Sequence, residues 1–206
     1  TELFAHIGDK YRTTDYKMLI GHSLGGLLAA HTLLNHPGIF DSYIAISPSL
    51  WWDEQDLVLN QSKEFFEKQD KLRGHFYMTM GNEGGTMVGG AWKLQALLEE
   101  QGPDKLIWAF DRMEDEDHGS IPFRSTYKGL KFIFSDFDLN ANMEAFEAGT
   151  LSLADYENRV EMMYHEAPNW ERGRLLRIGE QLFNNVSPAA ALPFFQKATE
   201  LFPKHV

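Results

Sequence analysis

A serine between glycines is the first feature of the sequence that could do chemistry. The pentapeptide Gly21-His22-Ser23-Leu24-Gly25 has the G-x-S-x-G pattern, in which a serine occupies a sharp turn between a strand and a helix. The apolar run Tyr16–Ile20 precedes it, and a helical stretch rich in leucine and alanine follows it. This context favours Ser23 as a nucleophile, with the backbone N–H of Leu24 as an oxyanion donor. The alternative is a glycine-rich turn with an idle serine.

A serine hydroxyl needs a general base to become a good nucleophile. The chain has eight histidines, and His118 alone follows the last strand-like run of the first two thirds of the sequence. In the order nucleophile, acid, histidine that such sites follow along the chain, His118 is the candidate base. The alternative is a surface histidine in an acidic loop.

The acid that orients such a histidine should follow the preceding strand. Glu83 is the one carboxylate in the loop Gly81–Gly85 and is the candidate. A Ser-His dyad without an acid is a second option. The remaining rivals are the carboxylates close to His118 in sequence, which are Asp111, Glu114, Asp115 and Asp117.

A pair of tryptophans follows another strand-like run, in Ser49-Leu50-Trp51-Trp52-Asp53. The carboxyl ends of parallel strands meet at one edge of a sheet, where ligands bind. Trp51 and Trp52, together with His22 beside the serine, are therefore candidate substrate-binding residues. Packing of the tryptophans beneath a lid is the alternative.

Four apolar runs predict the strands that would position these residues. They are Tyr16–Ile20, Asp41–Ile46, His75–Met80 and Leu106–Phe110, with helical segments between them, among them Trp92–Gln101. Strands that alternate with helices predict an α/β fold, with a mostly parallel sheet and helices on both faces.

From about residue 137 the strand-like runs stop and helical periodicity continues to the end. We therefore predict an α/β domain over 1–138 and a helical domain over 139–206. The last part fits a tetratricopeptide repeat, and a generic helical hairpin is the alternative. The positions that match the repeat are Leu175, Ile178, Gly179, Leu182, Ala191, Phe195, Ala198 and Pro203.

Composition excludes several classes of function. The 206 residues are 43% hydrophobic and contain no cysteine, so thiol catalysis and thiolate metal sites are excluded. A formal charge of -11 disfavours nucleic acids, anionic membranes and strongly anionic ligands. No metal site or cofactor is expected.

Three motifs resemble the esterase D-type family of α/β-hydrolases: Gly21–Gly26, Ser47–Trp52 and Asp117–Ser120. Within this family the sequence is most similar to the siderophore esterases that cleave trilactone scaffolds. The resemblance covers roughly residues 1–135, and it implies Ser23 as nucleophile, His118 as base and Leu24 as an oxyanion donor. It is less specific about the acid, because the family varies at the position of Glu83.

The leading hypothesis is a metal-independent serine esterase that acts on a small-molecule ester. The alternatives are an acyltransferase of the same fold, or an idle hydrolase platform whose C-terminal helices bind a partner protein or a second copy. In the usual α/β-hydrolase order, several strands precede the nucleophile. We therefore expect a longer intact protein that supplies the second oxyanion donor, and we expect residues 1–206 alone to be inactive and poorly soluble.

Overall fold

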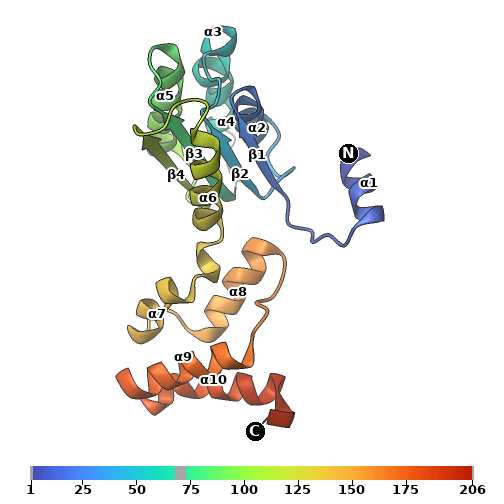
Figure 1. Cartoon of the computed structure of the whole chain (residues 1–206), viewed down its shortest axis with the longest axis vertical. Helices are drawn as coiled ribbons and strands as arrows, with labels where there is room; N and C mark the ends of the chain where they lie inside the picture. Colours follow the sequence, from blue (N-terminus) through green and yellow to red (C-terminus); the bar gives the residue numbers. More distant parts are fainter. Residues whose placement is uncertain (1, 68–72, 206) are drawn as a thin grey trace. The chain divides into compact units, whose positions relative to one another are not determined.

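The computed structural model describes residues 2–67 and 73–205. The chain divides into two compact units, Thr1–Ile133 and Phe134–Val206 (Figure 1). The first unit contains α1 (Glu2–Lys10), β1 (Met18–His22), α2 (Leu24–Asn35), β2 (Ser42–Ile46), α3 (Trp52–Asp56), the π-helical turn η1 (Leu57–Gln61), α4 (Ser62–Glu67), β3 (Gly74–Gly81), α5 (Thr86–Gln101), β4 (Leu106–Met113) and α6 (Ile121–Ile133).

The four strands of the first unit form one parallel sheet in the order β1-β2-β3-β4. Every residue of β2 and β3 is buried. Parallel strands that are covered on both faces read as continuous apolar runs, and this is why the sequence predicted them without an alternating pattern. The parallel sheet with its helices confirms the predicted α/β fold class.

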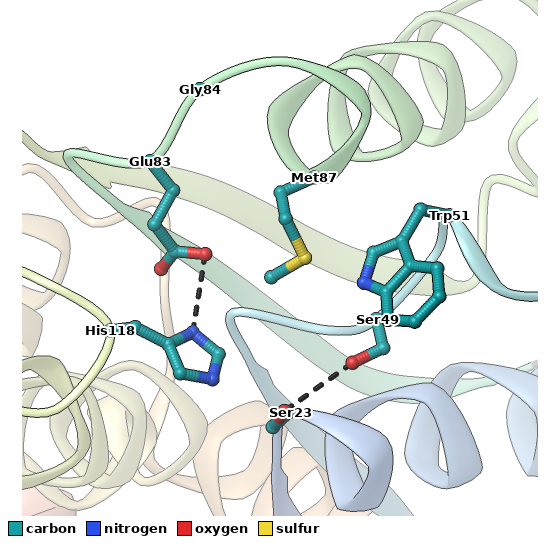
Figure 2. Close-up of a pocket in the computed structure, with 7 residues that line it drawn as sticks. All are labelled: Ser23, Ser49, Trp51, Glu83, Gly84, Met87 and His118. Carbon is teal, nitrogen blue, oxygen red and sulfur yellow. Dashed lines mark hydrogen bonds and ion pairs between the residues drawn. The ribbon is translucent and has the colours of Figure 1, made fainter.

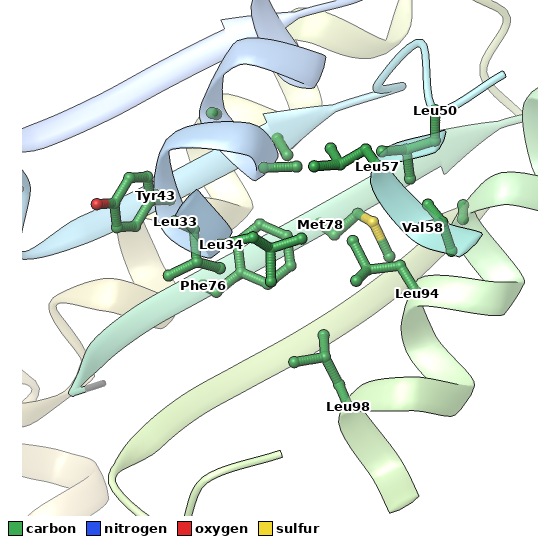
Figure 3. Packing of buried hydrophobic residues seen from close by; sticks show 14 of the residues in the cluster. Leu33, Leu34, Tyr43, Leu50, Leu57, Val58, Phe76, Met78, Leu94 and Leu98 are labelled. Carbon is green, nitrogen blue, oxygen red and sulfur yellow. The ribbon is translucent and has the colours of Figure 1, made fainter. Parts of the chain in front are cut away.

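One face of the sheet carries the larger apolar core, shown in Figure 3. Tyr43 of β2 together with Phe76 and Met78 of β3 points into this core, because alternate residues of a strand face the same side. The helices α2 and α5 cover these side chains. They contribute Ala29, Ala30, Leu33 and Leu34 from α2, and Val88, Ala91, Leu94 and Leu98 from α5.

Helix α6 packs on β2 and β3. Ile44 and Tyr77, which pair across these strands, lie against Gly129 of α6. A Cβ atom on Gly129 would stand 2.6 Å from Cδ1 of Ile44, so the glycine permits the close approach of helix and sheet. The hydroxyls of Thr79 and Ser125 are 2.8 Å apart in the same layer. Helix α6 is thereby fixed directly after the loop that carries His118.

The second unit is helical. It contains η2 (Ser135–Phe137), α7 (Leu139–Glu147), α8 (Leu153–Tyr164), α9 (Arg172–Asn185), α10 (Pro188–Leu201) and η3 (Pro203–His205). Ser152 caps α8 by accepting the N–H of Asp155, and Ser187 caps α10 by accepting the N–H of Ala190. The helical extension agrees with the end of the strand-like runs near residue 137. The predicted boundary at 138/139 falls between η2 and α7.

Helices α9 and α10 are joined by two residues and lie side by side (Figure 1). Leu175, Ile178 and Leu182 of α9 and Phe194 and Ala198 of α10 are buried, and Gly179 of α9 lies close to the ring of Phe195 of α10. The tetratricopeptide assignment of this hairpin stays a prediction. In the described part of the chain, no helix has both the length and the apolar character needed to cross a bilayer.

Candidate active site

Ser23 lies at the junction of β1 and α2, with backbone angles φ 59° and ψ −115°. A non-glycine residue with positive φ is strained, and it persists where the surrounding structure fixes it. The backbone of Ser23 is held by β2 and the segment that follows it. Its N–H donates to the carbonyl of Ile46 at 2.9 Å, and its carbonyl accepts the N–H of Ser49 at 3.0 Å.

Two of the neighbouring glycines are required by close backbone contacts. A Cβ atom on Gly21 would stand 1.9 Å from the carbonyl oxygen of Gly25, and one on Gly26 would stand 2.9 Å from that of Ile46. A Cβ atom on Gly25 would meet nothing within 4 Å. The strand-to-helix turn therefore depends on glycine at 21 and 26, one of which lies outside the pentapeptide.

The N-terminus of α2 begins directly after Ser23. The first backbone N–H groups of a helix have no acceptor within the helix, and among the described residues no hydrogen bond from the N–H of Leu24 is found outside it. The helix dipole adds partial positive charge at this end. A developing oxyanion next to Ser23 would be stabilised there.

Glu83 and His118 contact each other in the cleft beside this turn. Oε2 of Glu83 lies 3.2 Å from Nδ1 of His118 (Figure 2). Both atoms are buried, and in the described part of the chain neither has an aligned hydrogen-bond partner. The pair therefore has the separation of a hydrogen bond but not its ideal angle, and each atom depends on the other to offset its loss of water.

The second ring nitrogen of His118 lies on the side of the imidazole that faces Ser23 (Figure 2). The Oγ atom of Ser23 is 3.3 Å from the Oγ atom of Ser49. Among the described residues, no hydrogen bond joins Ser23 to His118. Such contacts are often loose before substrate binds, so this geometry is compatible with His118 as the base.

The loop of His118 is held by Asp117. Its Oδ1 atom accepts the backbone N–H groups of Gly119 and Ser120, both at 2.8 Å, at the start of α6. These bonds to the charged carboxylate lower the pKa of Asp117. Asp117 therefore caps the loop, and among the described residues no hydrogen bond joins its carboxylate to the imidazole.

The other rival carboxylates also have partners of their own. Asp111 accepts from the hydroxyl of Tyr77 at 3.0 Å and from Lys128 at 2.6 Å. Glu114 is exposed and pairs with Arg112, and Asp115 pairs with Arg124. Of the five candidate acids, the structure brings Glu83 to the ring of His118.

Ser23, Glu83 and His118 line one cleft of about 460 Å³. Its wall consists of Ser23, Ser49, Trp51, Glu83, Gly84, Met87 and His118. Figure 2 shows Trp51 on the side opposite His118, and Met87 between Glu83 and Trp51. Of the predicted substrate-binding residues, Trp51 is thus in the cleft. Trp52 lines a different hollow together with Leu24 and His31.

His22 contacts the imidazole of His118 and is not among the described residues that line the cleft. The two rings are 4.5 Å apart between centroids, at an angle of 41°. Burial, followed by the nearby charge of His118, lowers the pKa of His22. His22 thus contacts His118, and its predicted contact with substrate stays a prediction.

Ser49 and Met87 also line the cleft, and neither was predicted from the sequence to do so. Ser49 follows β2 at the carboxyl edge of the sheet, and that position could have identified it. Met87 lies in the first turn of α5, which begins at Thr86. The sequence predicted that this helix begins only at Trp92. No pattern in the sequence marks Met87.

Comparisons with known proteins find similarity to esterases. Residues 1–91 match a family model described as "Putative esterase". The siderophore triacetylfusarinine C esterase of Aspergillus fumigatus is 29% identical over 155 residues, which are 58% of this chain and 49% of that protein. The chain therefore spans about half the length of this relative.

Two solved structures share the fold. The siderophore hydrolase EstB from Aspergillus nidulans aligns with a TM-score of 0.54 at 26% identity, over 64% of this chain and 54% of that one. An IroE-like serine hydrolase from Shewanella oneidensis aligns with a TM-score of 0.72 at 19% identity. This alignment covers 97% of the present chain and 64% of the other, so it spans both units.

Proposed function

We propose that this chain, which resembles the siderophore esterases, forms the catalytic site of a serine carboxylesterase. The observation that carries the proposal is the strained Ser23 at the start of α2, which opens into the same cleft as the Glu83–His118 pair. The match to the esterase family and the siderophore esterase relative support ester hydrolysis as the reaction class.

The reaction would proceed through an acyl-enzyme. His118 takes the hydroxyl proton of Ser23 as Oγ attacks the ester carbonyl, and the N–H of Leu24 donates to the oxyanion. The proton then passes from His118 to the leaving alkoxide, which departs as an alcohol. Water then attacks the acyl carbonyl as His118 takes its proton. The bond between the acyl carbon and Oγ breaks, His118 returns the proton to Oγ of Ser23, and the carboxylic acid leaves. Glu83 stabilises the imidazolium in both steps.

The cleft favours an uncharged ester. Of the described residues that line it, none is Lys or Arg, while Trp51 and Met87 offer apolar surface and Glu83 is anionic. The name of the Aspergillus fumigatus relative extends the proposal to ester bonds of siderophores. We expect the preferred substrate to place an apolar group against Trp51 and no carboxylate near Glu83.

A fluorophosphonate probe and p-nitrophenyl esters test the proposal in the full-length protein. Ser23→Ala should abolish labelling and lower kcat by about 10⁴-fold or more. Ser42→Ala is the matched control, because it removes a buried hydroxyl at the end of β2 away from the cleft and should leave labelling in place. Labelling that survives Ser23→Ala would overturn the proposal.

A further inference from the structure

Ser47 occupies a position that serine rarely takes. It follows β2 directly, it is completely buried, and its φ is 39°. Its N–H donates to the carbonyl of Thr79 at 2.9 Å, which fixes the backbone against β3. Glycine would adopt this φ without strain, so the backbone alone gives no reason for a serine here.

The hydroxyl of Ser47 contacts the carboxylate of Glu83. Its Oγ atom lies 2.6 Å from Oε1. The N–H of Gly81 approaches the same Oγ at 3.4 Å. A carboxylate can only accept hydrogen bonds, so the hydroxyl proton of Ser47 must point at Glu83. One oxygen of Glu83 is thereby occupied, and the other faces Nδ1 of His118.

Without such a bond the carboxylate would be poorly oriented. The terminal torsion of a glutamate has a broad, roughly two-fold energy profile, so the side chain does not select one plane by itself. The backbone of Gly81 also lies close to this carboxylate, since a Cβ atom added to Gly81 would stand 3.2 Å from Oε1. The contact with Ser47 is the described hydrogen bond that fixes Oε1.

We propose that Ser47 is a positioning residue that acts on His118 through Glu83. By holding Oε1, it turns Oε2 toward Nδ1 of His118 and keeps the proton on that nitrogen. The other ring nitrogen is then unprotonated and ready to accept the proton of Ser23. This inference rests on the proposed esterase function and adds to it the residue that sets the tautomer of the base.

Ser42 provides a matched control at the opposite end of β2. It is also completely buried, and its hydroxyl is hydrogen-bonded to the hydroxyl of Tyr16. Ser47→Ala should lower kcat for p-nitrophenyl esters about 10- to 100-fold with KM unchanged, as expected for a group that orients a reacting side chain. Ser42→Ala should leave kcat within about twofold of the parent.

Two further variants keep the test decisive. Ser47→Gly removes the hydroxyl but accepts the positive φ, so it should fold well and lose as much kcat as Ser47→Ala. On a Glu83→Gln background, Ser47→Ala should cause no further loss, because the two residues act as one unit. Normal kcat in both Ser47 variants, or losses that add to that of Glu83→Gln, would overturn the inference.

A spectroscopic measurement separates this inference from the proposed function. The Nδ1 proton of His118 should give a low-field NMR resonance that Ser47→Ala and Ser47→Gly shift or broaden, and Ser42→Ala should not move it. An unchanged resonance in both Ser47 variants would overturn the positioning role. A shifted resonance in a protein that shows neither labelling nor turnover would support the positioning role and refute the esterase.

Discussion

The imidazole rings of His22 and His118 lie in contact, with their centroids 4.5 Å apart. His22 belongs to β1 and His118 to the loop after β4, so the contact joins two parts of the chain that are far apart in sequence. Nε2 of His22 is buried without a hydrogen-bond partner in the described structure. Protonation of His22 would therefore be unfavourable, because the new positive charge would be buried and would lie beside His118.

This contact predicts a loss of stability in acid. Burial and the neighbouring His118 lower the pKa of His22, so the unfolded chain binds a proton first as the pH falls below about 6.5. The free energy of unfolding should decrease from pH 7.5 to pH 5, and less so in His22→Phe, which keeps a ring against His118. Urea denaturation measures this. An equal decrease in both proteins would contradict the prediction, and above pH 7.5 their pH dependence should coincide.

Glu83→Gln should lower kcat about 10²- to 10⁴-fold, because an amide no longer stabilises the imidazolium or fixes its tautomer. Steady-state kinetics on p-nitrophenyl esters measures the effect. Glu114→Gln is the control, since Glu114 is an exposed rival carboxylate that pairs with Arg112. A full loss in Glu114→Gln, or none in Glu83→Gln, would show that another group orients His118.

Gly21→Ala should destabilise the first unit by about 3–5 kcal/mol, because the new Cβ atom would overlap the carbonyl of Gly25 at 1.9 Å. Gly25→Ala should change stability by about 1 kcal/mol or less, since its Cβ atom meets open space. Chemical denaturation compares these two glycines of the same motif. Similar effects at both positions would contradict the close contact between β1 and α2.

In the helical unit, Gly179→Ala should be less stable than Gly173→Ala by about 1–3 kcal/mol. Both glycines lie in α9, where alanine is the better helix former. At Gly179 the added Cβ atom would stand 2.6 Å from the ring of Phe195 in α10, whereas at Gly173 it meets nothing within 4 Å. Thermal unfolding of the two variants makes the comparison, and equal melting temperatures would argue against tight packing of α9 on α10.

The sequence predicted the order of the strands better than their ends. The first strand was expected at Tyr16–Ile20 and lies at Met18–His22, because Gly21 and His22 pair with β2 despite the low strand propensity of glycine. The fourth strand continues through Asp111 and Arg112, which pair with β3. In both cases pairing with a neighbouring strand outweighs local propensity.

The start of α5 was missed for a related reason. The helix begins at Thr86, six residues before the predicted start, and its first turns contain Gly89 and Gly90. Glycine disfavours a helix locally, but a Cβ atom on Gly90 would stand 2.7 Å from Cβ of Leu50. Close packing against Leu50 therefore requires glycine at position 90, although glycine makes the helix harder to predict from the sequence.

The candidate site was predictable where the chemistry depends on residue type and strand order. Residue type and position after a predicted strand identified Ser23, Glu83 and His118 as candidates. The structure places these three residues around one cleft, and their roles stay predictions. The sequence could not separate Trp51 from Trp52, because three residues with positive φ follow Trp52 and redirect the chain. It also could not indicate Ser47, because the residue type does not show that the hydroxyl points at Glu83.

Strand β4, at one end of the described sheet, has a consequence for how activity would be lost. It pairs with β3 alone in the described sheet, whereas β3 has a neighbour on each side. Strands with fewer partners open locally at a smaller free-energy cost than the centre of a domain. A transient opening at β4 would loosen the loop that carries His118 while β2 and β3 stay paired. The chemistry would then fail at a milder temperature or denaturant concentration than the one that melts the unit.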